Sequence, residues 1–498
     1  MDNTNFLVRQ EKQLGESLLK DSLKILALYF FTVLVIYKLP GIMGYILFIV
    51  FYILFYKSKK DYFWLAFFYA ICTGPGGFFY ISEEVTIGQL PIFRIGGGVN
   101  ISSVEILLIL AVFKAFNKGK KQQIPLAKPL GMLLFYSLFL FIVSFFVFGT
   151  PIIRFLKDLR YFFYFFSIIP LSYLVYKEGE GEKLIYCFFP FIFLSFFSAL
   201  YYIFIGNYFV NLFAPGLMRQ ITLGIKEGGS RYVTSLKGGG EILIFCYIFS
   251  LFLLFKTRLK KRRIYLSIIA WLSYIIVLLS ATRVWFVVFS FMFITMLIII
   301  RKNLKIVGEG IMIAVLLGAP YLMVPKIHNF ANLAWIRIAS VFEINREDSI
   351  AYTAIEAKKT RRLAKTMVGI KENPLVGWGD SNQFFEYTGG GDIGNFNLIL
   401  QVGIIGFLLF INFWMQYFLL VCKSNRKLSQ QNPYRGALLF LNISLTGLLI
   451  SHFTTHQIFG MVIAQAPATF IAFFVFLSGY FVKDALRTEY FLAKSNKM

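Results

Sequence analysis

The chain has 498 residues, of which 58% are hydrophobic, 19% aromatic and only 15% charged. Water could not wet most of the surface of so apolar a chain, which excludes the soluble, disordered and fibrous classes. The net charge of +25 comes from 50 basic against 25 acidic residues. The basic residues stand in short clusters between apolar runs, a pattern typical of membrane topology rather than of nucleic-acid binding. We therefore expect the lipid bilayer, and no nucleic acid, as a partner.

Apolar runs bounded by charge recur along the whole chain, and each can cross about 30 Å of hydrocarbon. Within lipid such runs must be helical, so the sequence predicts an all-α polytopic membrane protein with about fourteen transmembrane helices, or twelve to fourteen, in one membrane domain over 1–498. The predicted spans are 22–37, 40–56, 62–80, 101–116, 127–148, 160–176, 184–205, 241–255, 264–281, 284–300, 306–323, 396–421, 436–452 and 468–482. The short connections at Leu39-Pro40 and Ala281-Arg283 could instead be kinks within longer helices.

Basic clusters fall in even-numbered connections between the predicted spans, and this pattern orients the chain. The clusters are KSKK at 57–60, NKGKK at 117–121, KTRLKKRR at 256–263, RKNLK at 301–305 and KSNRK at 423–427. Because basic connections stay inside, these segments and both termini are expected in the cytoplasm.

Two segments on the opposite, external side are long enough to fold, 207–240 and 324–395. In the second, basic and apolar residues interleave from Ser349 to Ile370, which predicts an amphipathic helix and a large, partly helical external loop. No soluble domain is predicted in the cytoplasm, so the chemistry is expected within the membrane or outside it.

Cofactor motifs are absent from the sequence. It contains no GxxxxGK[ST] and no strand-associated GxGxxG, so we expect no nucleotide cofactor. His452 and His456 share one face at the outer end of a predicted helix and could ligate a metal. Since no Glu or Cys stands beside them, hydrogen-bonded histidines at the interface are the favoured interpretation, and we expect no metal.

Five arginines are predicted at the external membrane edge: Arg154, Arg160, Arg219, Arg231 and Arg283. A guanidinium costs roughly 2.5 to 3.5 kcal/mol at a helix centre, so arginines near spans snorkel, pair with acids or bind anions. Arg154 could simply pair with Asp158. Arg283 lies in a tight connection with no acidic neighbour in sequence, which favours anion binding. Several such planar forks would suit the oxygens of a diphosphate.

Asp392 is the acidic residue best placed to meet these arginines, because it precedes the span at 396–421 on the same side of the membrane. It could act as a general base, and it could equally cap the following helix. Three triple-glycine runs, at 96–98, 238–240 and 389–391, are also predicted outside, where they are interpreted as flexible loop corners.

Four segments together resemble the superfamily of O-antigen polymerases and O-antigen ligases. KENPLVGWGDSNQFF resembles the family's NPLxGxG element, and DIGNFNLILQVGIIGFLLF resembles its loop-to-helix junction with GxxG. LLSATRVWFVVF resembles its Ser-x-[ST]-Arg turn, and SRYVTSLKGGGE resembles its Arg-to-Gly segment. The resemblance covers roughly Arg231 to Phe410, and the segments occur in the family's order.

The resemblance implies a metal-independent glycosyltransferase in the bacterial cytoplasmic membrane that uses undecaprenyl-diphosphate-linked oligosaccharides and needs no cofactor. Arg231 and Arg283 match the family's external arginines. Ligases carry a His-Asn pair where this chain has Asp392-Ile393-Gly394-Asn395, so a polymerase of O-antigen or capsule is favoured. A ligase and a flippase of lipid-linked repeat units are the alternatives. The sequence leaves open whether a chain-length regulator binds.

Overall fold

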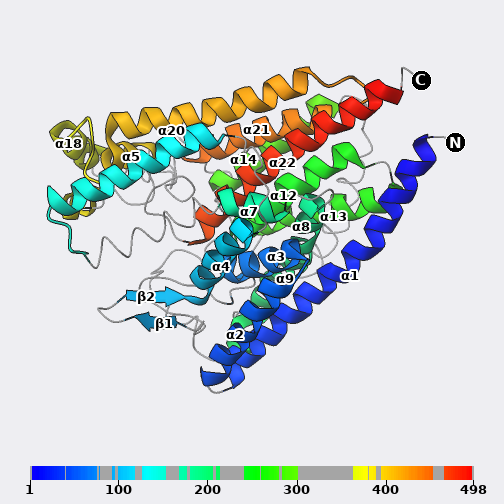
Figure 1. Ribbon diagram of the computed structural model, residues 1–498, viewed down its shortest axis with the longest axis horizontal. Coiled ribbons are helices and arrows are strands. Elements are labelled where there is room, and N and C mark those ends of the chain that lie inside the picture. The colour runs from blue at the N-terminus through cyan, green and yellow to red at the C-terminus, as the bar shows by residue number, and fades with distance from the viewer. Residues whose placement is uncertain are drawn as a thin grey trace. The chain divides into compact units, whose positions relative to one another are not determined.

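The computed structural model is mostly helical over the residues that it describes (Figure 1). The described residues are 3–39, 41–75, 78, 92–95, 99–117, 126–152, 168–175, 180–205, 209–213, 240–257, 259–279, 283–300, 363–379, 381–388, 394–452 and 465–495.

The chain groups into two compact units. Unit 1 comprises Met1–Ile92, Ser102–Ala111 and Leu174–Ile338, and unit 2 comprises Phe93–Ile101, Val112–Tyr173 and Ala339–Met498. Each unit therefore collects segments that are distant in sequence.

The described helices of unit 1 are α1 (Asn3–Lys38), α2 (Gly41–Lys57), α3 (Asp61–Thr73), α8 (Glu180–Phe188), α9 (Pro190–Ile205), the short 3-10 helix η2 (Phe209–Leu212), α12 (Gly240–Lys256), α13 (Lys260–Leu279) and α14 (Arg283–Ile300). Two further helices have residues in both units, α4 (Ser103–Asn117) and α7 (Ile168–Val175).

Unit 2 contains α5 (Ala127–Phe146), α18 (Ala364–Glu372), α19 (Asn382–Tyr387), α20 (Gly394–Arg426), α21 (Tyr434–His452) and α22 (Gln465–Ser495). A small two-stranded sheet pairs β1 (Ile92–Ile95) with β2 (Val99–Ser102). The glycine run at 96–98 stands between these strands, outside the described residues.

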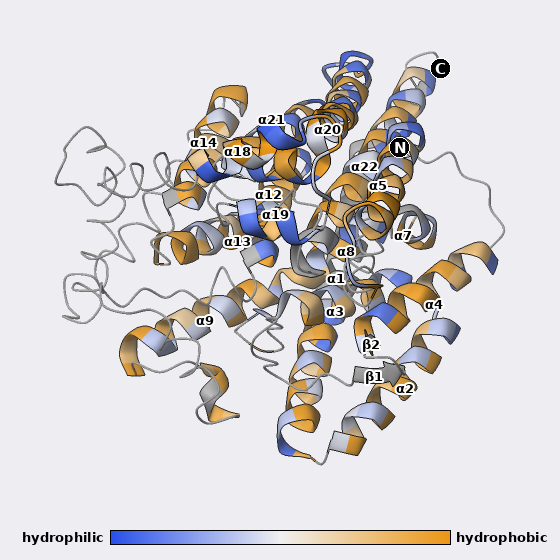
Figure 2. Cartoon of the chain, turned by 90° about the vertical axis from the view of Figure 1, so that its left-hand side faces the viewer, coloured by the Kyte–Doolittle hydropathy of each residue, from blue (hydrophilic) through white to orange (hydrophobic). Residues whose placement is uncertain are grey.

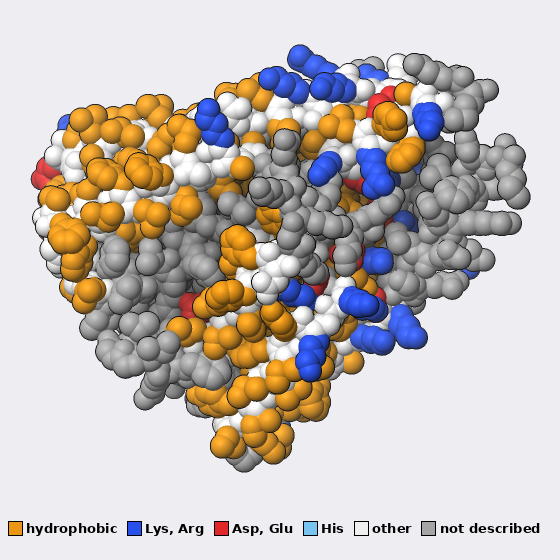
Figure 3. All heavy atoms as spheres, in the orientation of Figure 1, with side chains coloured by type: hydrophobic (Ala, Val, Ile, Leu, Met, Phe, Trp, Pro, Cys, Tyr) orange, Lys and Arg blue, Asp and Glu red, His pale blue; other side chains and the backbone are white. Residues whose placement is uncertain are grey.

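Six described helical segments are long and apolar enough to cross a membrane, which indicates a membrane protein. They are Ala127–Phe146, Glu180–Ile205, Lys260–Leu279, Gly394–Arg426, Tyr434–His452 and Thr469–Lys494. Hydrophobic residues predominate along the helices (Figure 2), and hydrophobic side chains cover much of the visible surface of the described residues (Figure 3).

The predicted total of about fourteen spans is not confirmed. Two more helices, Gly41–Lys57 and Val284–Ile299, are apolar but shorter than the six. Within the predicted span at 62–80, helix α3 ends at Thr73, because Gly74 adopts a left-handed conformation. The predicted span at 306–323 lies outside the described residues.

Helices α13 and α14, which flank the connection at Ala281-Arg283, pack as an antiparallel pair, although residues 280–282 lie outside the described residues. The ring of Trp271 lies 5.1 Å from that of Phe293, and the hydroxyls of Tyr274 and Ser290 are 2.8 Å apart. In both contacts a residue before the connection meets one equally far beyond it. The alternative interpretation of this connection, a kink within one long helix, is therefore wrong.

Charged side chains from four separate segments meet at one end of unit 1. Asp21 accepts hydrogen bonds from Lys60 at 2.9 Å and from Tyr62 at 2.6 Å, while Glu182 accepts from Arg262 at 2.7 Å and also from Lys256. Lys183 links the two groups, since its ammonium lies 5.4 Å from the centre of the Tyr62 ring. The segments around Lys60 and around Arg262 therefore lie at the same end of unit 1. The basic clusters predict the same side of the membrane for both.

The same agreement holds in unit 2. Ser429 and Asn432, which follow α20, donate hydrogen bonds of 3.0 Å to Glu489 on α22. Tyr434 at the start of α21 hydrogen-bonds to Asp484. The connection after α20 and the C-terminal part of α22 thus share one end of this unit, as the alternation of basic segments requires.

Candidate functional site at the break in α20

Helix α20 is broken at Gly403, in the middle of an apolar sequence. The backbone of Gly403 has φ 64° and ψ −178°, a conformation open essentially only to glycine. A break removes hydrogen-bond partners from the backbone groups on either side of it. Broken backbone is tolerated at membrane depth only where protein or a polar cavity surrounds it.

The loop at 373–379, which carries the sequence NPLVGWG, supplies the missing partners. Its first residues accept hydrogen bonds from the helix after the break, and its last residues donate to the helix before it. The four backbone hydrogen bonds are Ile404 N–H to the Pro374 carbonyl (2.8 Å), Ile405 N–H to Leu375 (3.2 Å), Trp378 N–H to Leu400 (2.9 Å) and Gly379 N–H to Gln401 (2.8 Å). Loop and helix therefore run antiparallel and hold each other.

Tyr136 on α5 completes the set of partners. Its hydroxyl donates a 2.7 Å hydrogen bond to the carbonyl of Val402 and also hydrogen-bonds to the backbone of Gly406. Tyr136 and Val402 belong to a buried apolar cluster with Leu140 and Leu398. The break is therefore satisfied from two directions, by the loop and by α5.

Glycine is required on both sides of this contact because the two backbones touch. A Cβ at Gly403 would collide with the carbonyl of Leu375, and one at Gly377 would lie 2.6 Å from the carbonyl oxygen of Gln401. Gly377 also has a positive φ of 74°, which L side chains rarely adopt. The glycines of NPLVGWG and of the helix thus serve a single interlocking contact, which we call the α20 lock.

Side chains of the loop fix its conformation. The amide of Asn373 donates to the carbonyl of Gly377 at 2.6 Å, and the indole N–H of Trp378 donates to the carbonyl of Gly369 on α18 at 2.8 Å. Ser381 caps α19 by accepting from the backbone N–H of Phe384 at 3.3 Å. These hydrogen bonds hold α18, the loop and the start of α19 together within the described residues.

Buried polar side chains surround the α20 lock. Asn397 and Gln401, one turn apart on α20 just before the break, are almost completely buried. Thr150, four residues beyond the end of α5, is 3% exposed, and its hydroxyl has no hydrogen-bond partner among the described residues. Polar residues in apolar spans are costly and mark functional regions of membrane proteins.

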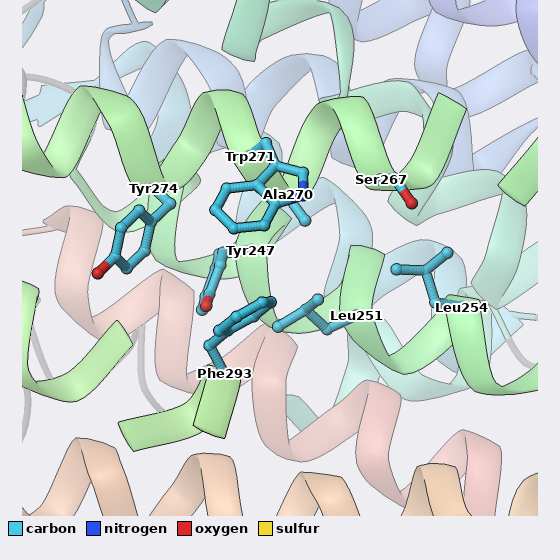
Figure 4. A pocket seen from close by; sticks show the side chains of 8 residues that line it. All are labelled: Tyr247, Leu251, Leu254, Ser267, Ala270, Trp271, Tyr274 and Phe293. Carbon is cyan, nitrogen blue, oxygen red and sulfur yellow. The ribbon is translucent and has the colours of Figure 1, made fainter. Parts of the chain in front are cut away.

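A second group of residues lies on the helices next to the predicted Arg283 turn. Figure 4 shows aromatic side chains from α12, α13 and α14, among them Tyr247, Trp271 and Phe293, around a small crevice. Tyr247 stacks on Phe289 with ring centres 4.1 Å apart and donates to its carbonyl at 2.9 Å. Because consecutive helices alternate in direction here, the starts of α12 and α14 share one end of the unit.

The predicted site residues fall mostly outside the described residues. Arg154, Arg160, Arg219, Arg231 and Asp392 all do, and Arg283 is described only as the first residue of α14. Their convergence and the roles of base and diphosphate ligand therefore stay predictions. The structure does bring together the two segments of the resemblance that flank Asp392, the NPLVGWG loop and the GxxG helix.

The histidine pair is also described only in part. His452, the last residue of α21, is buried, with its ring centre 6.3 Å from that of Phe410, whereas His456 lies outside the described residues. Among the described residues, no three His, Cys, Asp or Glu side chains come close enough to hold a metal ion.

Neither known family models nor curated proteins match this chain. The candidate site is therefore argued from the residues of this chain alone.

Sequence reasoning missed Tyr136 and the break itself. Tyr136 is separated from Val402 by 266 positions and lies in a predicted span rich in aromatic residues. The only local signals at the break are Gln401 within an apolar run and the glycine two positions later. Neither signal predicts which loop would pair with the break in α20.

Proposed function

We propose that this protein is a membrane glycosyltransferase that polymerises undecaprenyl-diphosphate-linked oligosaccharide repeat units into O-antigen or capsular polysaccharide. The observation that carries the proposal is the α20 lock. Two segments that separately resemble elements of one polymerase and ligase superfamily are bonded to each other residue by residue. If the two resemblances were accidental, there would be no reason for these two segments to be hydrogen-bonded to each other.

The reaction needs a general base and a group of residues that binds the diphosphate. A hydroxyl of the acceptor repeat unit attacks the anomeric carbon of the donor, the bond from that carbon to the diphosphate oxygen breaks, and the lipid diphosphate leaves. Asp392 takes the hydroxyl proton as general base. Arg231 and Arg283, with Arg154, Arg160 and Arg219, bind the diphosphate and stabilise the charge that develops on it.

Under this proposal the site faces the exterior of the bacterial cytoplasmic membrane, with both termini in the cytoplasm. Tags inserted at Lys260 and at Asn425 should report the cytoplasm, and a tag at Glu347 should report the exterior. The ion pairs at the end of unit 1 support the first of these placements, because Lys260 begins the helix that carries Arg262. A cytoplasmic signal at Glu347 contradicts the proposal.

The surface polysaccharide of a deletion strain tests the function directly. Single repeat units on the final acceptor indicate a lost polymerase. Lipid-linked polymer that never reaches its acceptor indicates a ligase, and repeat units retained inside indicate a flippase. Either of the last two outcomes rejects the proposal, and normal polymer in the deletion strain rejects all three.

A further inference from the structure

Three aromatic rings form a row beside the α20 lock. Trp378 lies in the middle, with its ring centre 5.2 Å from that of Phe148 and 6.1 Å from that of Tyr387. The rings come from the residues that directly follow α5, from the NPLVGWG loop and from the end of α19. All three side chains are partly exposed, so the row presents aromatic surface to whatever lies outside.

The described contacts hold two of these rings in place. The Trp378 indole donates to the Gly369 carbonyl at 2.8 Å, and Thr366 donates to the Tyr387 carbonyl at 3.0 Å. Gly369 leaves room for Tyr387, since a Cβ there would lie 2.6 Å from the ring. A rigid aromatic surface loses little entropy when a ligand binds to it.

Acceptor groups border the row. The Tyr387 hydroxyl donates to the carboxylate of Glu372, and this hydrogen bond raises the pKa of Tyr387 above its ordinary value. Glu386 contributes a second nearby carboxylate. Gln383, one turn before Tyr387 on α19, has a buried side-chain oxygen for which the described part of the chain offers no hydrogen-bond partner. The row thus combines apolar faces with an edge of hydrogen-bond acceptors.

These features match the chemistry of a sugar ring, which has a face of C–H groups and an edge of hydroxyl donors. Trp and Tyr also occur in belts at membrane interfaces, where they contact lipid headgroups. The two carboxylates disfavour that alternative, because they repel the phosphates of headgroups. We propose that Phe148, Trp378 and Tyr387 form a saccharide subsite that holds a sugar of the acceptor repeat unit. This assignment of a substrate part rests on the proposed glycosyltransferase function.

The test measures binding without turnover. The probe is the repeat-unit oligosaccharide released by mild acid from the surface polysaccharide of the producing cells, added to the purified full-length protein in nanodiscs. Trp378→Ala and Tyr387→Ala should each weaken binding about tenfold, whereas Tyr387→Phe, which keeps the ring, should stay within about threefold of wild type. Phe385→Ala is the matched control, since Phe385 is an exposed ring on the same helix that does not belong to the row.

A second measurement remains valid if the alanine variants fold poorly. Binding should change the tryptophan fluorescence of the wild type. Trp378→Phe should bind with similar affinity yet lose most of that change, although five of the six tryptophans remain. Unchanged affinity in folded Trp378→Ala and Tyr387→Ala overturns the subsite. An unaltered fluorescence response in Trp378→Phe overturns it as well. The subsite is also overturned if the variants weaken binding to anionic vesicles but not to the oligosaccharide.

Kinetics separate this inference from the function on which it rests. If the protein polymerises, loss of the rings should raise KM for the acceptor while leaving kcat nearly unchanged. An unchanged KM then rejects the subsite and leaves the polymerase intact. If the deletion strain still makes polymer, the polymerase fails, and the oligosaccharide titration alone decides whether the row binds sugar.

Discussion

The end of unit 1 and the break in unit 2 both place polar groups among apolar helices, and they stabilise them by different means. At the end of unit 1, Glu182 pairs with Lys256 and Arg262, and these side chains are 5%, 23% and 9% exposed. At the α20 lock the polar groups belong to the backbone, and their partners are the backbone of the loop and the hydroxyl of Tyr136.

The two regions differ in which part of the residue makes the stabilising contact, the side chain in unit 1 and the backbone in unit 2. An ion pair depends on the side chains, so charge reversal or neutralisation breaks it. The α20 lock depends on side chains being absent at Gly377 and Gly403, so the smallest addition breaks it. The first kind of contact is visible in a sequence as charge, and the second only as glycine.

Gly403→Ala should have the largest effect. The new Cβ meets the Leu375 carbonyl, and the backbone conformation itself costs of order 1–3 kcal/mol for a residue other than glycine. We expect a loss of roughly 3 kcal/mol or more and little folded protein, measured as accumulation and as the thermal midpoint in detergent. Gly131→Ala on α5 is the control, because nothing lies within 4 Å of its Cβ and alanine favours helix. Equal stability of the two variants would remove the lock as a determinant of folding.

Glu182→Gln should come next. It leaves the shape of the side chain nearly intact but removes the charge that compensates Lys256 and Arg262, and breaking a buried pair from one side costs about 3–5 kcal/mol. Partial exposure of Lys256 places the expected loss toward the lower value. Denaturant titration of the purified protein measures it. A loss below about 1 kcal/mol would mean that water already solvates the group.

Much of the helical architecture could be predicted from the sequence, because apolar runs bounded by charge report directly on helices in lipid. The predicted span at 436–452 corresponds to α21 within two residues at its start. The predicted spans at 284–300 and 127–148 likewise correspond to α14 and α5. The helix that replaces the predicted span at 396–421 is broken, and periodicity could not predict this, because LILQVGIIGFLLF is apolar on both sides of Gly403.

The candidate site was less accessible to sequence reasoning. The NPLVGWG loop and the GxxG helix were recognised as separate segments, but their pairing depends on backbone hydrogen bonds, which any residue can make. The contribution of Tyr136 depends on the packing of α5 against α20, which no local pattern encodes. Only charge and position point to Arg283 and Asp392, and their roles stay predictions.

Tyr136→Phe should have an intermediate effect on the α20 lock. It keeps the ring in the cluster with Leu140 and Val402 but leaves the Val402 carbonyl without the hydroxyl donor. A buried carbonyl left unsatisfied costs about 1–3 kcal/mol. The thermal midpoint should fall accordingly, whereas Tyr490→Phe, at a side chain 67% exposed, should leave it unchanged. Identical midpoints for both variants would show that the loop alone satisfies the break.

Lys60→Gln should have the smallest effect and a characteristic pH dependence. The Lys60 side chain is 56% exposed and that of Asp21 is 6% exposed, so solvent screens the pair and its loss should cost less than about 1 kcal/mol at neutral pH. Burial opposes ionisation of Asp21, but the hydrogen bond from Tyr62 and the charge of Lys60 together lower its pKa. The stability from Asp21 is therefore present above its unfolded pKa of about 4 and is lost as the pH falls through the lower, folded value. Lys60→Gln removes the Lys60 charge that helps to lower this pKa, so acid unfolding should begin at a higher pH than in the wild type. A loss at neutral pH as large as that of Glu182→Gln would show that the two ion-pair groups are equally shielded from water.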